Sequence, residues 1–454
     1  MFVFGGFVVQ YFGVFKDILH QWNDNDPAIV YCEKVYTYGD LKEKVEHISN
    51  LISDKIPTAS VVTLKSDMSF DGICAFIALC NHQCIIVPVS TNSLSNLENF
   101  HKTAQSDYII EYIENHLIIK EQKSISQKHP YYEELYKRKT AGLVVFSSGS
   151  SGEPKGAVHD LNNIFEKFTK PRKKLTTLSF LLFDHLGGIN TFLYNLSSGG
   201  CLVIPQNKLV GHVLALVEKF SVNLLPTSPS FLNLVLASRL YDDYDLSSLQ
   251  IVSYGTELMH EETLNKLSKV FPDVILQQTY GLTEIGVLRS KSQNNKSLWV
   301  KLGGKEFQTR VVEGKLQIKG KSTMIGYLNA PNPFTADGWL QTGDNVLVDG
   351  EYYKILGRDT DIIIVGGQKV YPSEVESVIL QMKEVDDVAV YSEKNSLLGS
   401  IVCAKIIINK EYVNINPKKL IKEFCVNKLE KFKIPVKVIA TDSIVNNRFK
   451  KIRN

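Results

Sequence analysis

Residues 143–156 read LVVFSSGSSGEPKG, an apolar segment that runs directly into a loop of hydroxyls, glycines and one lysine. The segment Leu143–Phe146 has the length and β-branched content of a buried strand. In the loop, glycines let backbone N–H groups approach a ligand, serine hydroxyls can donate hydrogen bonds, and Lys155 supplies positive charge. The spacing is not that of a Walker loop, and a flexible linker is disfavoured by the buried strand before it. The stretch predicts a phosphate-binding loop in an α/β protein.

Short apolar, β-branched runs alternate with helix-length stretches on both sides of this loop. We expect strands at 61–64, 84–89, 177–182, 201–205, 250–253 and 274–278, and helices at 211–220, 229–239 and 260–271. Strands that alternate with helices predict parallel sheets covered by helices on both faces. The chain up to about residue 300 is therefore expected to be a large α/β region.

The pattern changes after about residue 300 to short strands with Gly and Asp turns, at 315–319, 345–348 and 351–355. Asp349-Gly350 is a two-residue hairpin signal between the last two. Strands expected near 388–391 and 401–408 then belong to another alternating segment. Because chains longer than roughly 250–300 residues split into separate domains, we predict a domain over 1–356, a hinge over 357–361 and a second domain over 362–454.

The composition is that of an ordinary globular protein, with 454 residues, 44% hydrophobic, 22% charged and a formal net charge of +3. So small a charge predicts no nucleic-acid partner. Seven cysteines fit reduced thiols and a cytoplasmic location, and Cys80 and Cys84 lack the second ligand pair of a zinc site. The uncharged segment 1–15 is too short to cross a bilayer and is expected to pack against the protein, so no transmembrane segment is predicted.

Three further segments could carry chemistry. In Tyr280-Gly281-Leu282-Thr283-Glu284, the aromatic ring can stack on a base and the carboxylate can hold Mg²⁺. Residues 339–344, WLQTGD, would alone be a turn that contains an aspartate. Residues 357–361, GRDTD, followed by VGG at 365–367, would alone pass for a connecting loop.

In this order, the segments resemble the adenylate-forming superfamily, which contains acyl-CoA synthetases, luciferases and the adenylation domains of non-ribosomal peptide synthetases. The match runs from residue 147 to 453, and Thr37-Tyr38-Gly39-Asp40-Leu41 is similar to the family's T-Y-x-x-L opening. The resemblance implies a large α/β N-terminal domain of mostly parallel sheets layered with helices, a small β-barrel-like subdomain, and a smaller mobile C-terminal α/β domain. It also implies that a carboxylate attacks the α-phosphate of ATP, giving an acyl-adenylate and pyrophosphate, before an acceptor takes the acyl group.

The resemblance assigns the nucleotide site residue by residue. The β- and γ-phosphates would be held by Ser147, Ser148, Gly149, Ser150, Ser151, Gly152 and Lys155. Further nucleotide contacts would come from Gly255, Thr256, Glu257, Gln278, Thr279, Tyr280, Gly281 and Thr283. Glu284 would be the Mg²⁺ ligand. Asp344 would grip the ribose, since a carboxylate can accept from both hydroxyls, and Arg358 would be its partner at the hinge.

The tail 442–453, DSIVNNRFKKIR, resembles the family segment l-P-x-x-x-x-G-K-x-x-R. This places Lys451 at the position of the adenylation lysine, although Val445 replaces proline and Lys450 replaces glycine, so Lys450 is an alternative. Such a lysine would bridge the attacking carboxylate and the α-phosphate and stabilise the charge of the transition state. Without the upstream motifs, the segment would be interpreted as a solvated basic tail.

The segment Phe183–Gly188 leaves the substrate acid open. As H-x-x-G it resembles acyl- and aryl-CoA ligases, with catalytic His185 at the gate between acyl pocket and thiol channel. As F-D it resembles enzymes whose aspartate, here Asp184, pairs with an amino-acid ammonium. The remaining pocket residues would be Asn190, Ser253 and Tyr254.

The acceptor is most simply CoA, because residues 362–376 resemble the CoA-ligase branch. Gly366 and Gly367 would approach the thiol, and Thr360 marks the hinge position. We therefore predict an acid–thiol ligase, with ATP and Mg²⁺ as cofactors and CoA or a phosphopantetheine carrier protein as acceptor. The alternatives are a free-standing amino-acid-adenylating enzyme that loads a carrier protein, a luciferase-like oxygenase, and a nucleotide-binding relic without catalysis.

Overall fold

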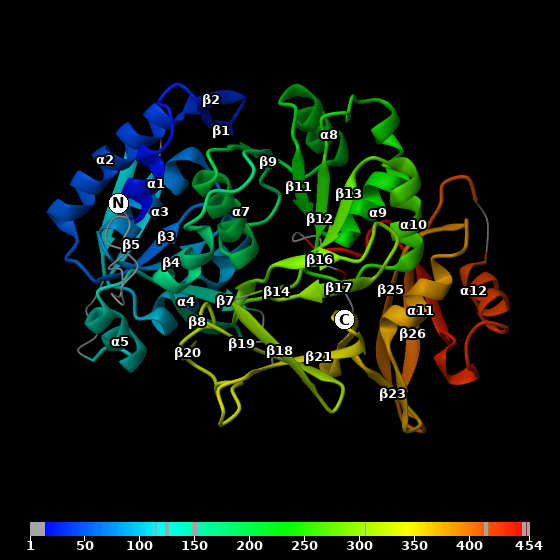
Figure 1. Ribbon diagram of the computed structural model, residues 1–454. Helices are drawn as coiled ribbons and strands as arrows, with labels where there is room; N and C mark the ends of the chain where they lie inside the picture. The colour runs from blue at the N-terminus through cyan, green and yellow to red at the C-terminus, as the bar shows by residue number, and fades with distance from the viewer. Residues whose placement is uncertain are drawn as a thin grey trace. The chain divides into compact units, whose positions relative to one another are not determined.

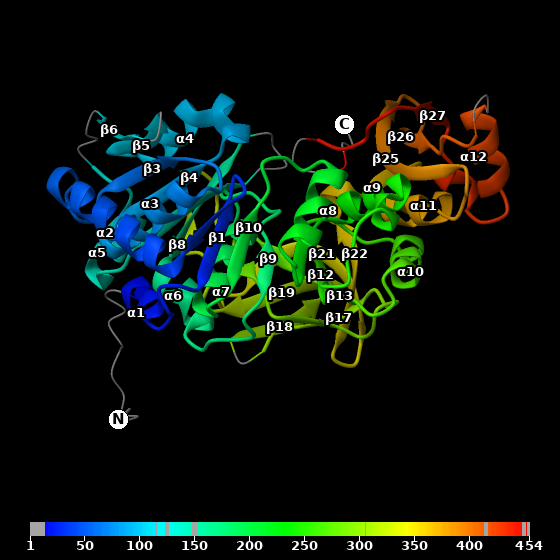
Figure 2. The same ribbon diagram turned by 90° about the horizontal axis from the view of Figure 1, so that it is seen from above.

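The computed structural model describes residues 14–113, 116–122, 127–147, 153–304, 306–412, 416–446 and 451 (Figures 1 and 2). These residues form two compact units. Unit 1 contains the described residues up to Gln206 with Thr283–Gly286 and Lys321–Asn332, and unit 2 contains Asn207–Leu282, Val287–Gly320 and the described residues from Pro333 on. Unit 2 includes both sides of the predicted hinge, so a domain boundary at 357–361 stays a prediction.

Unit 1 is built on a seven-stranded sheet of order β20-β8-β7-β4-β3-β5-β6. Its strands are β3 (Val61–Lys65), β4 (Ile85–Val89), β5 (Tyr108–Ile113), β6 (His116–Glu121), β7 (Gly142–Ser147), β8 (Lys155–Asp160) and β20 (Gly326–Tyr327). β3 runs parallel to β4 and β5, whereas β8 is antiparallel to β7. The strand predicted at 143–146 is thus β7, and its partner β8 begins with Lys155.

A second group of strands in unit 1 has the order β9-β10-β1-β2, with β1 (Pro27–Tyr31), β2 (Lys34–Thr37), β9 (Thr176–Leu178) and β10 (Cys201–Ile204). Helix α3 (Phe70–Asn81) contacts both β1 and the β3–β4 pair, and ten of its twelve residues are buried. A helix that is apolar on all sides is stable only when it is covered on all sides. Cys80 and Cys84 are buried, as expected, and burial raises the pKa of both thiols.

The remaining helices of unit 1 are α1 (Val14–His20), α2 (Tyr38–Lys55), α4 (Leu97–Ala104), α5 (Pro130–Arg138), α6 (Leu161–Phe165) and α7 (Leu186–Ser197), with 3₁₀ turns η1 (Thr91–Asn96) and η2 (Glu166–Phe168). The T-Y-x-x-L segment begins α2. Thr37 and Asp40 form a reciprocal capping box, and Tyr38 is fully buried with its hydroxyl donating to the Gly200 carbonyl at 2.9 Å. This opening is therefore explained by helix capping and packing.

Unit 2 contains three parallel strands, β11 (Leu224–Thr227), β12 (Ile251–Tyr254) and β13 (Ile275–Gln278), with helices α8 (Val210–Lys219), α9 (Pro229–Ser238) and α10 (Glu261–Val270). A six-stranded antiparallel sheet follows, of order β16-β17-β22-β21-β19-β18. Its strands are β16 (Ser290–Ser292), β17 (Trp299–Leu302), β18 (Phe307–Val312), β19 (Lys315–Gly320), β21 (Leu340–Asp349) and β22 (Tyr352–Arg358). Asp349 pairs with Tyr352, so the hairpin loop is Gly350-Glu351, one residue later than predicted.

The C-terminal part of unit 2, orange and red in Figure 1, is a third sheet with two helices. It contains β23 (Ile363–Val365), β24 (Gln368–Val370), β25 (Val385–Asn395), β26 (Gly399–Ile408) and β27 (Lys437–Ala440), with α11 (Pro372–Ile379) and α12 (Pro417–Cys425). Helix α9 contacts β25. Both units combine helices and sheets, so the predicted α/β class is confirmed. Among the described residues, no helix is both long and apolar enough to cross a membrane, and the apolar segment 1–13 lies outside them.

Candidate active site

Tyr327 contacts both Lys155, predicted to bind phosphate, and Glu284, the predicted Mg²⁺ ligand, in unit 1. Its hydroxyl donates to the Glu284 carboxylate, and the Lys155 ammonium lies over its ring, 5.6 Å from the centroid. Strand β20 places it there, since Tyr327 pairs with Ala157, two residues after Lys155 on β8. Lys155 and Glu284 are half-buried, and the tyrosine contacts both. The group leaves a cation and a carboxylate that are able to take ligands.

The backbone at Thr283-Glu284 is fixed from two sides. The Nε2 atom of His159 lies 2.7 Å from the Thr283 carbonyl oxygen, and the Met324 N–H donates to the Glu284 carbonyl at 2.7 Å. Burial lowers the pKa of His159 to about 4, so the ring is neutral at pH 7. A carbonyl can only accept, and Nε2 therefore carries the proton.

The predicted phosphate loop begins at the half-buried Ser147 and ends before Lys155, while Ser148, Gly149, Ser150, Ser151 and Gly152 lie outside the described residues. Its C-terminal flank is anchored by Asn329, whose side chain accepts from the Gly156 N–H at 3.0 Å and donates to the Pro154 carbonyl at 2.9 Å. A Cβ atom at Gly156 would lie 3.0 Å from the Phe146 ring, so the glycine permits this close packing.

In unit 2, two predicted nucleotide segments lie at the carboxyl ends of neighbouring parallel strands. Tyr254 of β12 pairs with Gln278 of β13, which brings Gly255 beside Thr279. A Cβ atom at Gly255 would lie 2.4 Å from the Thr279 hydroxyl oxygen, so only glycine fits. The side-chain oxygen of Gln278 is buried and, within the described part of the chain, accepts no hydrogen bond. Ligands of α/β proteins bind at such strand ends, and an unsatisfied buried acceptor there suits one.

Asp344 is the centre of a second group in unit 2. Asp344 of β21 pairs with Arg358 of β22, and the Arg358 Nε donates to its Oδ1 at 3.1 Å, as the predicted partnership requires. The hydroxyl of buried Tyr280 donates to the other oxygen, a contact that was not predicted. Burial raises the pKa of Asp344, and Arg358 and Tyr280 act against that rise.

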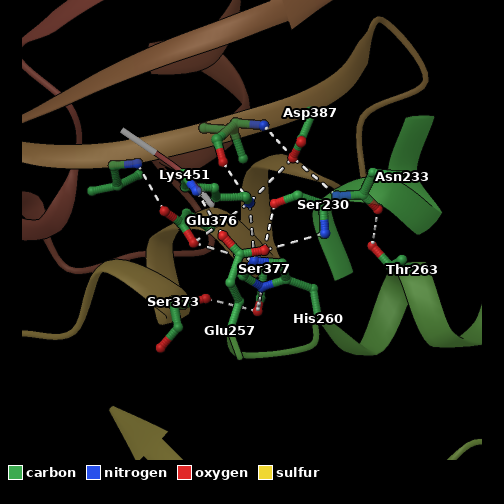
Figure 3. A network of polar contacts seen from close by, with 12 residues as sticks. Ser230, Asn233, Glu257, His260, Thr263, Ser373, Glu376, Ser377, Asp387 and Lys451 are labelled. Carbon is green, nitrogen blue, oxygen red and sulfur yellow. Dashed lines mark hydrogen bonds and ion pairs between the residues drawn. The ribbon is translucent and has the colours of Figure 1, made fainter. Parts of the chain in front are cut away.

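Glu257 and Lys451 meet elsewhere in unit 2 (Figure 3). Glu257 accepts from the Ser230 hydroxyl at 2.5 Å and from the Lys451 backbone N–H at 2.6 Å. The Lys451 side chain is only 6% exposed, and its ammonium donates to the Val388 carbonyl at 2.7 Å. The other candidate, Lys450, lies outside the described residues.

The predicted acyl-pocket residues occur in both units. In unit 1, buried Asp184 accepts from the Ser90 and Ser93 hydroxyls at 2.7 Å each, which ties it to η1. His185 is the residue before α7, with its Nε2 3.9 Å from Asp184 Oδ1, and half-buried Asn190 lies on α7. In unit 2, Ser253 and Tyr254 end β12. The hydrogen bonds from the Ser90 and Ser93 hydroxyls give Asp184 a structural role, because they tie the segment before α7 to η1.

Two family models match this chain. Residues 15–328 match the AMP-binding enzyme model, and residues 374–451 match the AMP-binding enzyme C-terminal domain. The chain belongs to the AMP-binding enzyme family. The predicted superfamily is thereby confirmed, and the family models leave residues 329–373 between them.

Curated relatives of this AMP-binding enzyme include CoA ligases. The putative long chain fatty acid-CoA ligase VraA of Staphylococcus epidermidis is 24% identical over 444 residues, which cover 94% of this chain and 93% of that protein. The 4-coumarate--CoA ligase 3 of Oryza sativa subsp. japonica is 28% identical over 342 residues, which cover 68% of this chain and 61% of that protein. The match to the rice ligase thus spans about six tenths of that relative's length.

Solved structures share the fold. The anthranilate CoA ligase AuaEII in complex with anthranoyl-AMP aligns with a TM-score of 0.81 and 18% identity, covering 97% of this chain and 95% of that one. ATP-bound MatB from Rhodopseudomonas palustris aligns with a TM-score of 0.78 and 19% identity, covering 97% of each chain. At these identities, the alignments show that the AMP-binding enzyme fold extends over nearly the whole chain.

The residues predicted for the acceptor side and the hinge lie on exposed turns. Gly366 and Gly367 form the two-residue turn between β23 and β24, with φ of 54° and 83°, values that favour glycine at both positions. Thr360 lies in the exposed 3₁₀ turn η4 (Asp359–Asp361). The turn geometry explains why glycines occur here, while a thiol contact stays a prediction.

Several site residues were missed from the sequence. They are His159, Asn329 and Tyr327 in unit 1, and His260, Glu376 and Asp387 in unit 2. Each acts through a partner far away in the chain, so no local spacing indicates it. Glu376 lies in the stretch 362–376, which was interpreted only for the choice of acceptor.

Proposed function

We propose that this enzyme uses ATP to activate a carboxylic acid as an acyl-adenylate, releases pyrophosphate, and transfers the acyl group to a thiol, most simply that of CoA. The observation that carries the proposal is the Lys155–Tyr327–Glu284 group. It brings together a lysine that could bind phosphate and a carboxylate that could bind Mg²⁺, and the two residues belong to motifs that follow each other along the chain as in the family. The CoA-ligase names of its relatives support the acid–thiol class.

Each group of residues has a role in this reaction. Lys155 would bind the β- and γ-phosphates together with the 147–152 loop, and Asp344 would accept from the ribose hydroxyls once a nucleotide displaces the Tyr280 hydroxyl or shares its acceptor. Glu284 is suited to bind Mg²⁺, which prefers carboxylate oxygens. The Tyr327 hydroxyl donates to Oε1, and among the described residues no hydrogen bond to Oε2 would have to be broken when the ion binds. When bound, Mg²⁺ neutralises phosphate charge and assists the departure of pyrophosphate.

Lys451 would supply the charge at the reacting centre. Its ammonium would contact the attacking carboxylate and the α-phosphate, and loss of one such preorganised contact typically costs about 3–4 kcal/mol of transition-state stabilisation. His185 and Asn190 would contact the acyl group, the role also predicted for Ser253 and Tyr254, and Gly366-Gly367 would lie on the acceptor side.

A fatty or aryl acid is favoured over an amino acid. Asp184, the residue that would pair with an α-ammonium, already accepts from the Ser90 hydroxyl, the Ser93 hydroxyl and the Ser90 N–H. All three donors bind the same oxygen, Oδ2, and give Asp184 a role in the fold. The CoA-ligase interpretation of Phe183–Gly188 is favoured over the amino-acid-activating one by the resemblance of residues 362–376 to CoA ligases and by the CoA-ligase names of the relatives.

The test is an ATP–pyrophosphate exchange assay over a panel of fatty, aryl and amino acids, followed by product analysis with CoA and with a phosphopantetheine carrier. We expect acid-dependent exchange with one acid class and an acyl-CoA product. Exchange confined to an amino acid, with transfer only to the carrier, would favour the alternative ligase. ATP binding without exchange for any acid would favour the nucleotide-binding relic.

A further inference from the structure

The ammonium of Lys451 is enclosed by acceptors from several segments of unit 2 (Figure 3). Its Nζ lies 2.7 Å from the Val388 carbonyl oxygen, 3.1 Å from Asp387 Oδ1 and 3.8 Å from Glu376 Oε2. The Nε2 atom of His260 lies 3.4 Å from the ammonium and 3.2 Å from Glu376 Oε2. We call Val388, Asp387, Glu376 and His260 the lysine seat. An ammonium held by these groups cannot also contact a phosphate.

The two carboxylates of the seat are held in place by other residues. Asp387 Oδ1 also accepts from Asn233 Nδ2 at 3.0 Å and from the Val388 N–H at 2.8 Å. Fully buried Glu376 accepts from the Val390 N–H at 2.8 Å. The acceptors are therefore positioned by the fold of unit 2 and do not depend on the lysine for their orientation.

Neighbouring polar residues support this arrangement. The side-chain oxygen of Asn233 accepts from the Thr263 hydroxyl at 2.8 Å. The Nδ1 atom of His260 lies 3.1 Å from the Ser377 hydroxyl, which donates to the Ser373 carbonyl at 2.7 Å. A network with its members satisfied in this way is preorganised.

The charges of the seat require a cation. Glu376 and Asp387 are 0% and 4% exposed, and burial and the Lys451 charge both lower the pKa of His260, against the effect of the two carboxylates. Two buried carboxylates without a counter-ion are strongly unfavourable. Lys451 supplies the positive charge, and its backbone N–H is also held by Glu257 at 2.6 Å.

We propose that Asp387, Glu376 and His260 are positioning residues that store Lys451 in a docked state, and that acid activation requires its release from the seat. The docked state stands on the contacts alone. The link to acid activation rests on the proposed function, in which Lys451 is the adenylation lysine. Because only the released fraction could act, the seat would set the rate of the adenylation step.

Competitive trace labelling of the full-length protein with acetic anhydride measures docking without any substrate. We expect Lys451 to react about ten-fold more slowly than Lys419, which is 73% exposed. Peptide fragmentation by mass spectrometry separates Lys451 from Lys450. Equal labelling of Lys451 and Lys419 in the unmodified protein would overturn the docked state.

Asp387→Asn tests the seat directly, because it removes one negative charge at nearly constant shape. We expect labelling of Lys451 to increase several-fold toward the Lys419 level. The matched control is Glu393→Gln, which removes an ion pair of the same sheet, that of Glu393 with half-exposed Lys437 at 2.7 Å, and leaves the seat intact. The control should leave Lys451 protected, and an Asp387 variant that behaves like the control would contradict the proposal.

A variant that fails to fold would be replaced by Asn233→Ala, which keeps every charge and removes only the amide that orients Asp387. It should give a smaller increase in Lys451 labelling, with the circular dichroism spectrum unchanged. No increase from a folded Asn233 variant and from Glu376→Gln would reject positioning by the seat.

The link to catalysis is read separately by pyrophosphate exchange. In Asp387→Asn, we expect kcat for exchange to rise about three- to ten-fold with the KM for ATP unchanged, because the released fraction grows. Exposed Lys451 with an unchanged or lower kcat would reject the rate-setting role. Absence of exchange in the unmodified protein with every acid would instead count against the proposed function, and the labelling result would still decide the docked state.

Discussion

Two regions of the molecule each contain a lysine, a glutamate and a histidine, but the lysine and the glutamate are partnered differently in the two regions. In unit 1, Lys155 contacts the Tyr327 ring and Glu284 contacts the Tyr327 hydroxyl, and both charges stay half-buried. In unit 2, Lys451 pairs directly with buried carboxylates. The first arrangement keeps a cation and an anion available to ligands, whereas the second uses the cation to neutralise the protein's own charge.

The difference shows that residue type alone does not distinguish a ligand-binding lysine from a stored one. What distinguishes them is the nature of the partner. An aromatic face attracts an ammonium without neutralising it, so Lys155 keeps its charge for phosphate. The buried carboxylates neutralise Lys451, and all of these charges have lost their hydration. Removing the lysine or a carboxylate should therefore lower the stability of the fold.

The largest expected effect is on stability. Lys451→Ala leaves Glu376 and Asp387 buried without their cation, and breaking such a pair typically costs about 3–5 kcal/mol. Lys155→Ala removes a half-buried lysine that has no carboxylate partner in the described contacts, and should change the unfolding free energy by less than about 0.5 kcal/mol. Thermal and urea unfolding of both variants measures this difference.

Activity should fall in both variants, for different reasons. Lys451→Ala should lower the exchange rate by about 10²–10³ while ATP still binds to the folded fraction, and Lys155→Ala should weaken ATP binding itself. Equal stability of the two variants would contradict the contrast between the regions. Full exchange activity of Lys451→Ala would show that the tail alignment is wrong.

His159 gives the next largest effect, and it is confined to unit 1. Burial lowers its pKa from 6.5 to about 4, so below pH 6.5 the unfolded chain binds a proton that the folded chain does not. The folded state should then lose about 1.4 kcal/mol per pH unit, to a total of about 3 kcal/mol at pH 4. Above pH 6.5, the ring is neutral in both states and contributes no slope.

Denaturant unfolding of the unmodified protein and of His159→Gln between pH 7 and pH 4 isolates this proton. The variant should be the less stable one at pH 7, because the Thr283 contact is weakened, and the difference should shrink as the pH falls. Parallel pH profiles for the two proteins would mean that His159 takes up its proton while folded.

The sequence predicted the parts of the fold that depend on local pattern. Alternating apolar runs located β3, β4, β7, β12 and β13, whereas the Asp344–Arg358 partnership was implied only by the family resemblance, and the structure pairs the two residues across one hairpin. The antiparallel pair β5–β6 was missed, since its edge strand carries polar residues and lacks a clear period.

Contacts between distant segments could not be predicted. Tyr327 reaches Lys155 only because β20 lies beside β8, and that sheet order is not encoded in any local spacing. The lysine seat and the residues that support it come from α9, α10, α11 and β25, so the burial of Lys451 is a property of their packing. From its neighbours in sequence, Lys451 looks like part of an exposed basic tail.

Tyr327→Phe should have a smaller effect, because it keeps the ring under Lys155 and removes only the hydroxyl on Glu284. Loss of one hydrogen bond to a charged group corresponds to about 1.5–3 kcal/mol at most, and a partly exposed carboxylate should recover some of it from water. We expect the Mg²⁺ concentration for half-maximal ATP binding, followed by calorimetry, to rise about three- to ten-fold. Tyr327→Leu, which also removes the ring, should in addition weaken ATP binding at saturating Mg²⁺.

An unchanged Mg²⁺ requirement in Tyr327→Phe would show that the hydroxyl does not orient Glu284 for a metal. The comparison of the two regions would then be weakened on the unit 1 side, because Tyr327 would contact the two charges without preparing them for a ligand.

The smallest effect is expected at Asp184, a buried carboxylate whose Oδ2 accepts from the Ser90 and Ser93 hydroxyls and from the Ser90 N–H. Asp184→Asn keeps an acceptor oxygen for the Ser90 and Ser93 hydroxyls and removes the charge, so the kcat/KM for the preferred acid should change by less than about ten-fold. The measurement is exchange with the best fatty or aryl acid and with the best amino acid, before and after the substitution. A selective collapse of amino-acid exchange would assign Asp184 to an ammonium and overturn the acid class. Unchanged ratios between the acids would make Asp184 a structural group, and unit 1 would then hold one carboxylate kept for a ligand, Glu284, beside another that serves the fold.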